Sequence, residues 1–201
     1  MASETRRPTG DSNVFGFTLG PPTGAPYYVK VDEEVADDIT TYLQNPSTNG
    51  YAFFTFSAFT VPTSAVVNSL TMWHRSTKNG ATANHIATAV VVASTVYHTI
   101  DSGGSIGAKL VWETSSFAYV LNPKTNTSWL PEDVNGGSAN PLNCIGVWSN
   151  EGNPDVYCTQ IYAVVDYTEY VSTSGEAALF FEPPVDSHYM RGHYRGGFRG
   201  M

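Results

Sequence analysis

The feature that most constrains this chain is a series of segments rich in β-branched and aromatic residues, separated by short clusters of Gly, Pro, Asn, Ser and Asp. Such segments have the length and composition of β-strands, and the clusters between them favour turns. The predicted strands are Tyr27–Val31, Tyr51–Phe59, Ala65–Arg75, Ile86–His98, Ala108–Val120, Leu142–Trp148 and Val156–Tyr167. The turn clusters occur at 61–64, 78–80, 101–104 and 150–154.

One predicted strand shows which way its side chains point. Between residues 69 and 75 two sets alternate, Leu70, Met72 and His74 on one face and Thr71, Trp73 and Arg75 on the other. A period of two packs the first set against a core and leaves the second set less buried. Strands in this number need a second sheet over their apolar face. We therefore expect an all-β fold, an antiparallel two-sheet jelly-roll sandwich.

Both ends of the chain are predicted to be extended arms. Residues 1–26 are rich in Pro and Gly and show neither strand nor helix periodicity, so we expect an irregular N-terminal arm. Residues 27–171 should form the sandwich, and residues 172–201 a C-terminal arm. Within the sandwich, residues 32–43 form either an acidic turn or a short helix. Residues 121–141 form a long connection between strands.

The charge and hydropathy of the chain exclude some partners. The formal charge of −8 comes from 10 Lys and Arg against 18 Asp and Glu, which disfavours nucleic acid and anionic membranes. The first residues lack the apolar core of a signal peptide, and the longest apolar run, Ile86–Val96, is too short to cross a bilayer. We therefore expect a soluble protein that is made in the cytosol and has no membrane partner.

No residue pattern predicts a catalytic site, a cofactor or a metal. Gly103–Gly107 matches the Gly-x-Ser-x-Gly sequence of hydrolases around Ser105, but a strand is predicted to follow it, which favours a hairpin turn. Cys144 and Cys158 have neither metal-ligand spacing nor the setting of a disulfide framework. The histidines form no ligand pair, and the acidic clusters match no calcium loop. A non-enzymatic protein is therefore predicted.

The most distinctive stretch is Asn122–Asn135, which contains an Asn-Pro-x-Thr turn, Trp129 and an Asp-Val-Asn segment. The strand Thr159–Tyr167 follows it and ends in Val-Asp-Tyr. This combination resembles a structural module of tailed bacteriophages, over residues 27–167. The resemblance implies a jelly roll like that of carbohydrate-binding modules and a structural role in capsid decoration, head fibres or tails. It does not extend to residues 1–26 or beyond Val171.

Six residues are predicted to make interactions. Asn122 suits a turn closed by its own side chain, and Trp129 can pin the long connection onto the sandwich. The other four, in the C-terminal segment of arginines, aromatics and glycines, are Arg191, Arg195, Phe198 and Arg199. Because the body is acidic, we favour docking of this tail onto another protein, with nucleic-acid binding and disorder as alternatives.

These patterns predict a virion structural protein, homo-oligomeric and trimeric, which binds the major capsid protein or another virion protein through arms that gain order on binding. The alternative is a carbohydrate-binding module of a receptor-binding appendage, in which exposed aromatic side chains stack on a host glycan. The candidates for stacking are Tyr97, Trp112, Trp129 and Trp148. A third hypothesis is a hydrolase with Ser105 as its nucleophile.

Overall fold

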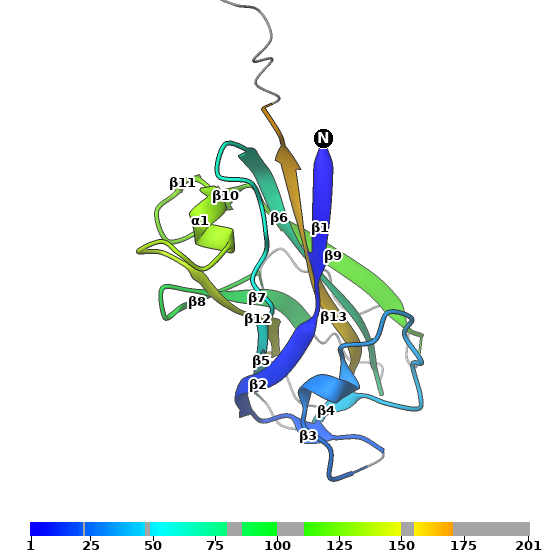
Figure 1. Cartoon of the computed structure of the whole chain (residues 1–201). Coiled ribbons are helices and arrows are strands. Elements are labelled where there is room, and N and C mark those ends of the chain that lie inside the picture. Colours follow the sequence, from blue (N-terminus) through cyan, green and yellow to red (C-terminus); the bar gives the residue numbers. More distant parts are fainter. Residues whose placement is uncertain (22, 47–48, 80–85, 100–110, 150–154, 171–201) are drawn as a thin grey trace, which may run out of the picture. The chain divides into compact units, whose positions relative to one another are not determined.

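The computed structural model describes residues 1–21, 23–46, 49–79, 86–99, 111–149 and 155–170. These residues form two antiparallel sheets with a core between them (Figure 1). Sheet A contains, in spatial order, β3 (Thr18–Leu19), β4 (Leu43–Asn45), β13 (Val156–Thr168), β6 (Val66–Lys78) and β9 (Glu113–Tyr119), and β1 (Ala2–Arg6) also pairs with β13. Sheet B contains β2 (Pro8–Phe15), β5 (Gly50–Phe56), β12 (Leu142–Ser149), β7 (Ile86–Val92) and β8 (Thr95–His98). The prediction of an all-β two-sheet sandwich is confirmed.

The longest pairing in the molecule joins β6 to β13. Their register runs from Lys78 opposite Val156 to Val66 opposite Thr168, with two bulges on the way. The alternation predicted for this strand is confirmed. Leu70, Met72 and His74 are buried, and Thr71, Trp73 and Arg75 are half-buried on the other face.

The core lies between the inner faces of the two sheets. Leu70, Met72 and Ile161 reach it from sheet A, and Phe54 and Ile145 reach it from sheet B, all fully buried. Each such side chain contributes about 1.5–3 kcal/mol by leaving water. The two sheets are therefore held together mainly by apolar contact across this layer.

The predicted strand Ile86–His98 is a hairpin. Ala93 and Ser94 join β7 to β8, with φ angles of 45° and 64°. Positive φ at both central residues is the geometry of a two-residue turn that matches the twist of the flanking strands. Neither residue is the Asn or Gly that usually marks this turn, which explains why a single continuous strand was predicted.

The N-terminal segment is part of the sandwich, so the prediction of a free arm over residues 1–26 is wrong for residues 2–19. β1 pairs with Ala163–Tyr167 in sheet A, and β2 pairs with β5 in sheet B. In Figure 1 the blue ribbon passes from beside β13 to beside β5. These strands are largely polar, so no apolar period marks them. Pro8 begins β2, an edge position that tolerates a missing N–H.

The strand predicted at Tyr27–Val31 is instead a 3-10 turn, η1 (Tyr28–Lys30). The carboxylate of Asp11 accepts hydrogen bonds from the N–H groups of Tyr27 (3.0 Å) and Tyr28 (2.7 Å), which hold the turn against β2. The carbonyl of Val31 then accepts the N–H of Ile161 on β13 (2.8 Å). Residues 32–42 contain no helix, so the turn alternative applies there.

The long connection over residues 121–141 has its own small structure. It contains the hairpin β10 (Leu121–Asn122) and β11 (Thr127–Ser128), then the one-turn helix α1 (Pro131–Val134). Asn122 Oδ1 accepts the N–H of Lys124 (2.9 Å), and Asn122 Nδ2 donates to Asp133 Oδ2 (3.1 Å). Trp129 is 2% exposed, and its indole N–H donates to the carbonyl of Tyr119 (2.9 Å). Asn122 therefore closes a turn and Trp129 pins the connection, as the sequence suggested.

Some predictions lie outside the described residues. These are the C-terminal tail over 172–201, the motif around Ser105, and the turn clusters at 101–104 and 150–154. Residues 1–170 form one compact unit. Within the described part of the chain, no helix is long and apolar enough to cross a membrane.

The pairing of β1 leads to a stability test. Deleting residues 1–6 should lower the free energy of unfolding by roughly 1–3 kcal/mol, because β13 loses the backbone partners of five residues. Ser3→Ala is the control, because Ser3 is exposed and its backbone pairing remains, so a change within about 0.5 kcal/mol is expected. Urea unfolding measures both. An unchanged stability of the deletion variant would support a free arm.

Burial of His74 leads to a pH test. Burial lowers the pKa of His74 from 6.5 to about 4, so below pH 6.5 the unfolded chain binds a proton that the folded chain does not. The free energy of unfolding should therefore fall by roughly 3 kcal/mol between pH 6.5 and 4 on account of this residue. His74→Leu should show a shallower loss in urea titrations over that range. An identical pH slope in the two proteins would contradict the assignment.

Candidate functional site

The outer face of sheet B carries large apolar side chains. Among the described residues, no further sheet or helix packs over this face. Phe53, Ala89 and Cys144 form a second buried cluster there, separate from the main core, with Tyr51 and Trp148 packed against it. The usual outer face of an antiparallel sheet is polar. An apolar patch on such a face indicates a binding surface.

Aromatic rings follow one another across the strands of this sheet. Phe15 on β2, Tyr51 on β5 and Trp148 on β12 lie directly opposite one another in the strand register. The ring centroids of Phe15 and Tyr51 are 5.6 Å apart, and those of Tyr51 and Trp148 are 5.5 Å apart with an interplanar angle of 23°. Phe53 is the next residue along the same face of β5, and its ring centroid lies 5.1 Å from that of Tyr51. These spacings are typical of offset aromatic stacking.

The row continues past β7 because that strand carries small side chains. Ala87 lies opposite Trp148, and Ala89 lies opposite His98 of the edge strand β8. With only methyl groups between them, the rings of His98 and Trp148 stack at 4.8 Å. We call the five rings, Phe15, Tyr51, Phe53, Trp148 and His98, the aromatic face.

Gly146 leaves room at the centre of this face. It lies opposite Phe53 on one side and Ala89 on the other. A Cβ at Gly146 would overlap the carbonyl oxygen of Ala52 and lie 2.9 Å from Cδ1 of Phe53. Only glycine therefore allows β12 to approach β5 while the Phe53 ring lies over it.

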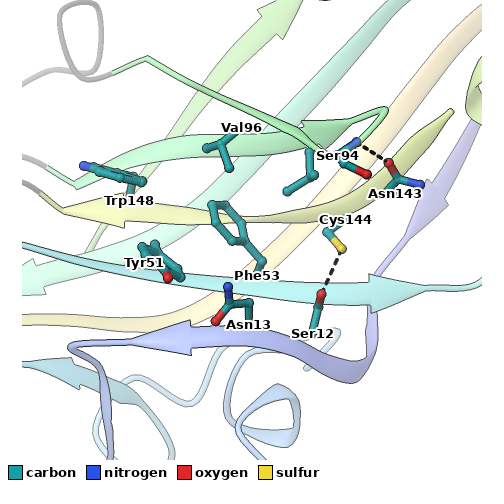
Figure 2. Close-up of a pocket in the computed structure, with 10 residues that line it drawn as sticks. Ser12, Asn13, Tyr51, Phe53, Ser94, Val96, Asn143, Cys144 and Trp148 are labelled. Atoms are coloured by element: carbon teal, nitrogen blue, oxygen red, sulfur yellow. Dashed lines mark hydrogen bonds between the residues drawn. The ribbon is translucent and has the colours of Figure 1, made fainter. Parts of the chain in front are cut away.

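A hollow of about 520 Å³ lies over the aromatic face (Figure 2). Tyr51, Phe53 and Trp148 form its apolar wall. Val91, Val96 and Cys144 also line it, and its polar lining comes from the uncharged side chains of Ser12, Asn13, Ser94 and Asn143. Figure 2 shows two hydrogen bonds that hold this lining, from Ser94 N–H to Asn143 Oδ1 (3.0 Å) and from Cys144 Sγ to Ser12 Oγ (3.2 Å).

The hollow is electrically neutral among the residues described. None of its described lining residues is Asp, Glu, Lys or Arg. Burial raises the pKa of the Cys144 thiol above its usual value, so this group stays protonated at neutral pH. Such a site can hold an uncharged ligand that has an apolar face for the rings and polar groups for the amides and hydroxyls.

No protein-family model matches the chain, and no curated protein matches it. Two of its structural neighbours are carbohydrate-binding modules. The C-terminal family 6 module of a marine laminarinase from Zobellia galactanivorans is 9% identical, with a TM-score of 0.44, and the match covers 82% of this chain and 100% of that one. A family 35 module from Cellvibrio japonicus is 15% identical, with a TM-score of 0.44 and coverage of 83% and 95%.

A third structure, a protein from a complex xyloglucan utilization locus in Bacteroides uniformis, is 9% identical with a TM-score of 0.42. That match covers 76% of this chain and 46% of the other. None of these three is a phage protein. Likenesses this distant concern only the general β-sandwich arrangement.

The structure separates the residues predicted to bind. Trp148 lies in the aromatic face. Trp129 and Asn122 are buried in the connection, so neither ring nor amide is available to a ligand. Tyr97 packs against the main core, and Trp112 lies in a different hollow. Arg191, Arg195, Phe198 and Arg199 lie outside the described residues.

Sequence reasoning missed Phe15, Tyr51, Phe53 and His98. One signal was present in β5, where Ala52 and Phe54 face the core while Tyr51 and Phe53 face outward. A strand with large apolar side chains on both faces carries a second contact surface. Phe15 had no comparable signal, because its segment showed no strand period.

The described residues that were considered for chemistry form no cluster. Among the described residues no three His, Cys, Asp or Glu side chains are arranged to hold a metal ion. Cys144 lies in sheet B and Cys158 in sheet A, and both are free thiols. Burial raises the pKa of Cys158 to about 12 and makes it unreactive. His85, His188 and His193 lie outside the described residues.

Gly146 can be tested against a second glycine. Gly146→Ala should destabilise the fold by roughly 2 kcal/mol or more, because backbone and Phe53 must both shift. Gly137→Ala should change stability by less than about 0.5 kcal/mol, because the nearest atom to a Cβ there is 4.0 Å away. Urea unfolding of both variants gives the comparison. Equal effects would show that Gly146 has no special packing role.

Proposed function

We propose that this protein is a non-catalytic glycan-binding module and that the aromatic face of sheet B is its binding site. The observation that carries the proposal is the continuous row of rings from Phe15 through Tyr51 and Trp148 to His98. Pyranose rings present C–H faces that stack on aromatic side chains, and their hydroxyl groups pair with amides and alcohols. The aromatic face supplies rings and its rim supplies those polar groups.

The neutrality of the hollow favours sugars over other ligands with apolar faces. A nucleotide or a sugar acid would bring negative charge to a lining that has no described cation and to a chain with a formal charge of −8. A purely apolar ligand would offer no hydrogen bond to the amide of Asn13 or to Nδ2 of Asn143, whose Oδ1 is already bonded to the N–H of Ser94. An uncharged glycan satisfies both the rings and the amides.

The expected virion role rests on the β-rich core, the two arms and the segment Asn122–Asn135, and the distinctive residues of that segment have local structural roles. Asn122 and Asp133 bond to each other, and Trp129 is enclosed by the core. A phage origin, a capsid partner, a trimer and a virion location stay predictions. Glycan binding is also compatible with a receptor-binding appendage.

A glycan array followed by calorimetry tests the proposal. Wild-type protein should bind at least one uncharged glycan, and Trp148→Ala should weaken that binding at least about tenfold, because the central ring of the row is lost. Trp73→Ala is the matched control, because Trp73 is a half-buried ring on the outer face of sheet A, where it stacks on Tyr162. That variant should bind as the wild type does.

The proposal fails if no glycan binds, or if Trp148→Ala and Trp73→Ala weaken binding equally. Unfolding midpoints of both variants show whether a loss of binding reflects a loss of the folded state.

A further inference from the structure

A second hollow, of about 320 Å³, lies at the end of sheet A. The strand register places Gln44 of β4 opposite Tyr157 of β13, and Tyr157 opposite Thr77 of β6. Tyr42 and Trp112 flank this row and line the hollow with Tyr157 and Thr77. Three aromatic residues from different parts of the chain therefore meet around one small space.

Two of these rings stand at right angles. The centroids of Tyr42 and Tyr157 are 5.2 Å apart with an interplanar angle of 88°, so the rings present an edge and a face to each other. Gly20 lies directly against Tyr42, because a Cβ at Gly20 would overlap its ring. This contact with Gly20 restricts the orientation of the Tyr42 ring. Trp112 adds a third ring to the lining.

Thr77 supplies a polar group that has no partner among the described residues. It lines the hollow and is 2% exposed, and its Oγ1 is buried without a hydrogen bond. A buried hydroxyl without a partner costs free energy and is uncommon in folded proteins. A ligand N–H or O–H in the hollow could satisfy it.

The charge next to the hollow is negative. Asp155 Oδ2 accepts Gln44 Nε2 (2.6 Å) and lies 3.4 Å from the hydroxyl of Tyr157. Burial, together with the charge of Asp155, raises the pKa of Tyr157, which stays a neutral phenol. Arg75, on the same face of β6 as Thr77, is paired with Asp38 at 2.6 Å. No Lys or Arg lines the hollow among the described residues.

We propose that this second hollow binds the ammonium group of an organic ligand, with Thr77 Oγ1 accepting one of its N–H groups. Aromatic faces attract cations, and the effect is largest where the cation is withdrawn from water. The carboxylate of Asp155 adds attraction, and the same charge disfavours anions. This site is separate from the aromatic face and does not depend on the glycan proposal.

Titration of the full chain with n-butylammonium chloride at constant ionic strength tests the proposal, with tryptophan fluorescence or amide NMR shifts as the readout. Binding should saturate. Butyrate and n-butanol should bind at least about tenfold more weakly, because they lack the cation. Glucosamine and N-acetylglucosamine form a second matched pair, in which only the first carries an ammonium group. Binding of both butylammonium and glucosamine supports the site and indicates that the ammonium group can come from an amino sugar. Binding of butylammonium alone also supports the site and indicates an alkylamine instead.

Two variants separate the hydroxyl from the charge. Thr77→Val keeps the shape of the side chain and should weaken butylammonium several-fold while leaving tetramethylammonium unchanged, because the latter has no N–H to donate. Asp155→Asn should weaken both cations. Thr71→Val, six residues earlier on the same face of β6, is the control and should change neither. The unfolding midpoint of each variant confirms that it is folded.

Three results would overturn the proposal. The first is no saturable binding of butylammonium. The second is equal binding of N-acetylglucosamine or butyrate. The third is an equal effect of Thr77→Val on butylammonium and tetramethylammonium.

Discussion

The ladder between β6 and β13 is the interaction on which the rest of the structure depends. It gives sheet A two long strands whose inner faces bury Leu70, Met72 and Ile161 against sheet B. The other edge of β13 carries β4 at one end and β1 at the other. The hollow at the end of sheet A exists because this ladder places Tyr157 beside Thr77. A shift of one residue would turn every one of these side chains to the opposite face.

Small residues allow the rings of the aromatic face of sheet B to pack closely. Rings on neighbouring strands approach closely only where the strand between or beneath them carries little bulk, and Ala87, Ala89 and Gly146 supply that space. The result is an apolar patch on the outer face of the sheet, and patches of this kind often mark binding sites in soluble proteins. The stacked rings therefore depend on the space that these small residues leave. A larger side chain at Ala87, Ala89 or Gly146 would change the positions of the rings.

Much of the sandwich could be predicted from the sequence, and little of the site could. The strands with strong periodicity, β5, β6, β12 and β13, lie within a few residues of their predicted limits. The failures have physical causes. β1 and β2 are polar edge strands with no apolar face to reveal them, and Ala93-Ser94 forms a turn without the usual turn residues. A site built from register needs the strand order, so Phe15 and His98 could not be joined to Trp148 in advance. Trp129 was recognised as important because its role is local.

The pairing of β1 with residues 163–167 has a consequence for how the protein is made. Each of these contacts joins residues about as far apart as the described chain allows, and such distant pairings slow folding because a long loop must close first. During synthesis, residues 2–6 cannot form these pairs until residues 163–167 have left the ribosome. The segment is largely polar, so in the meantime it offers little apolar surface for association with other nascent chains.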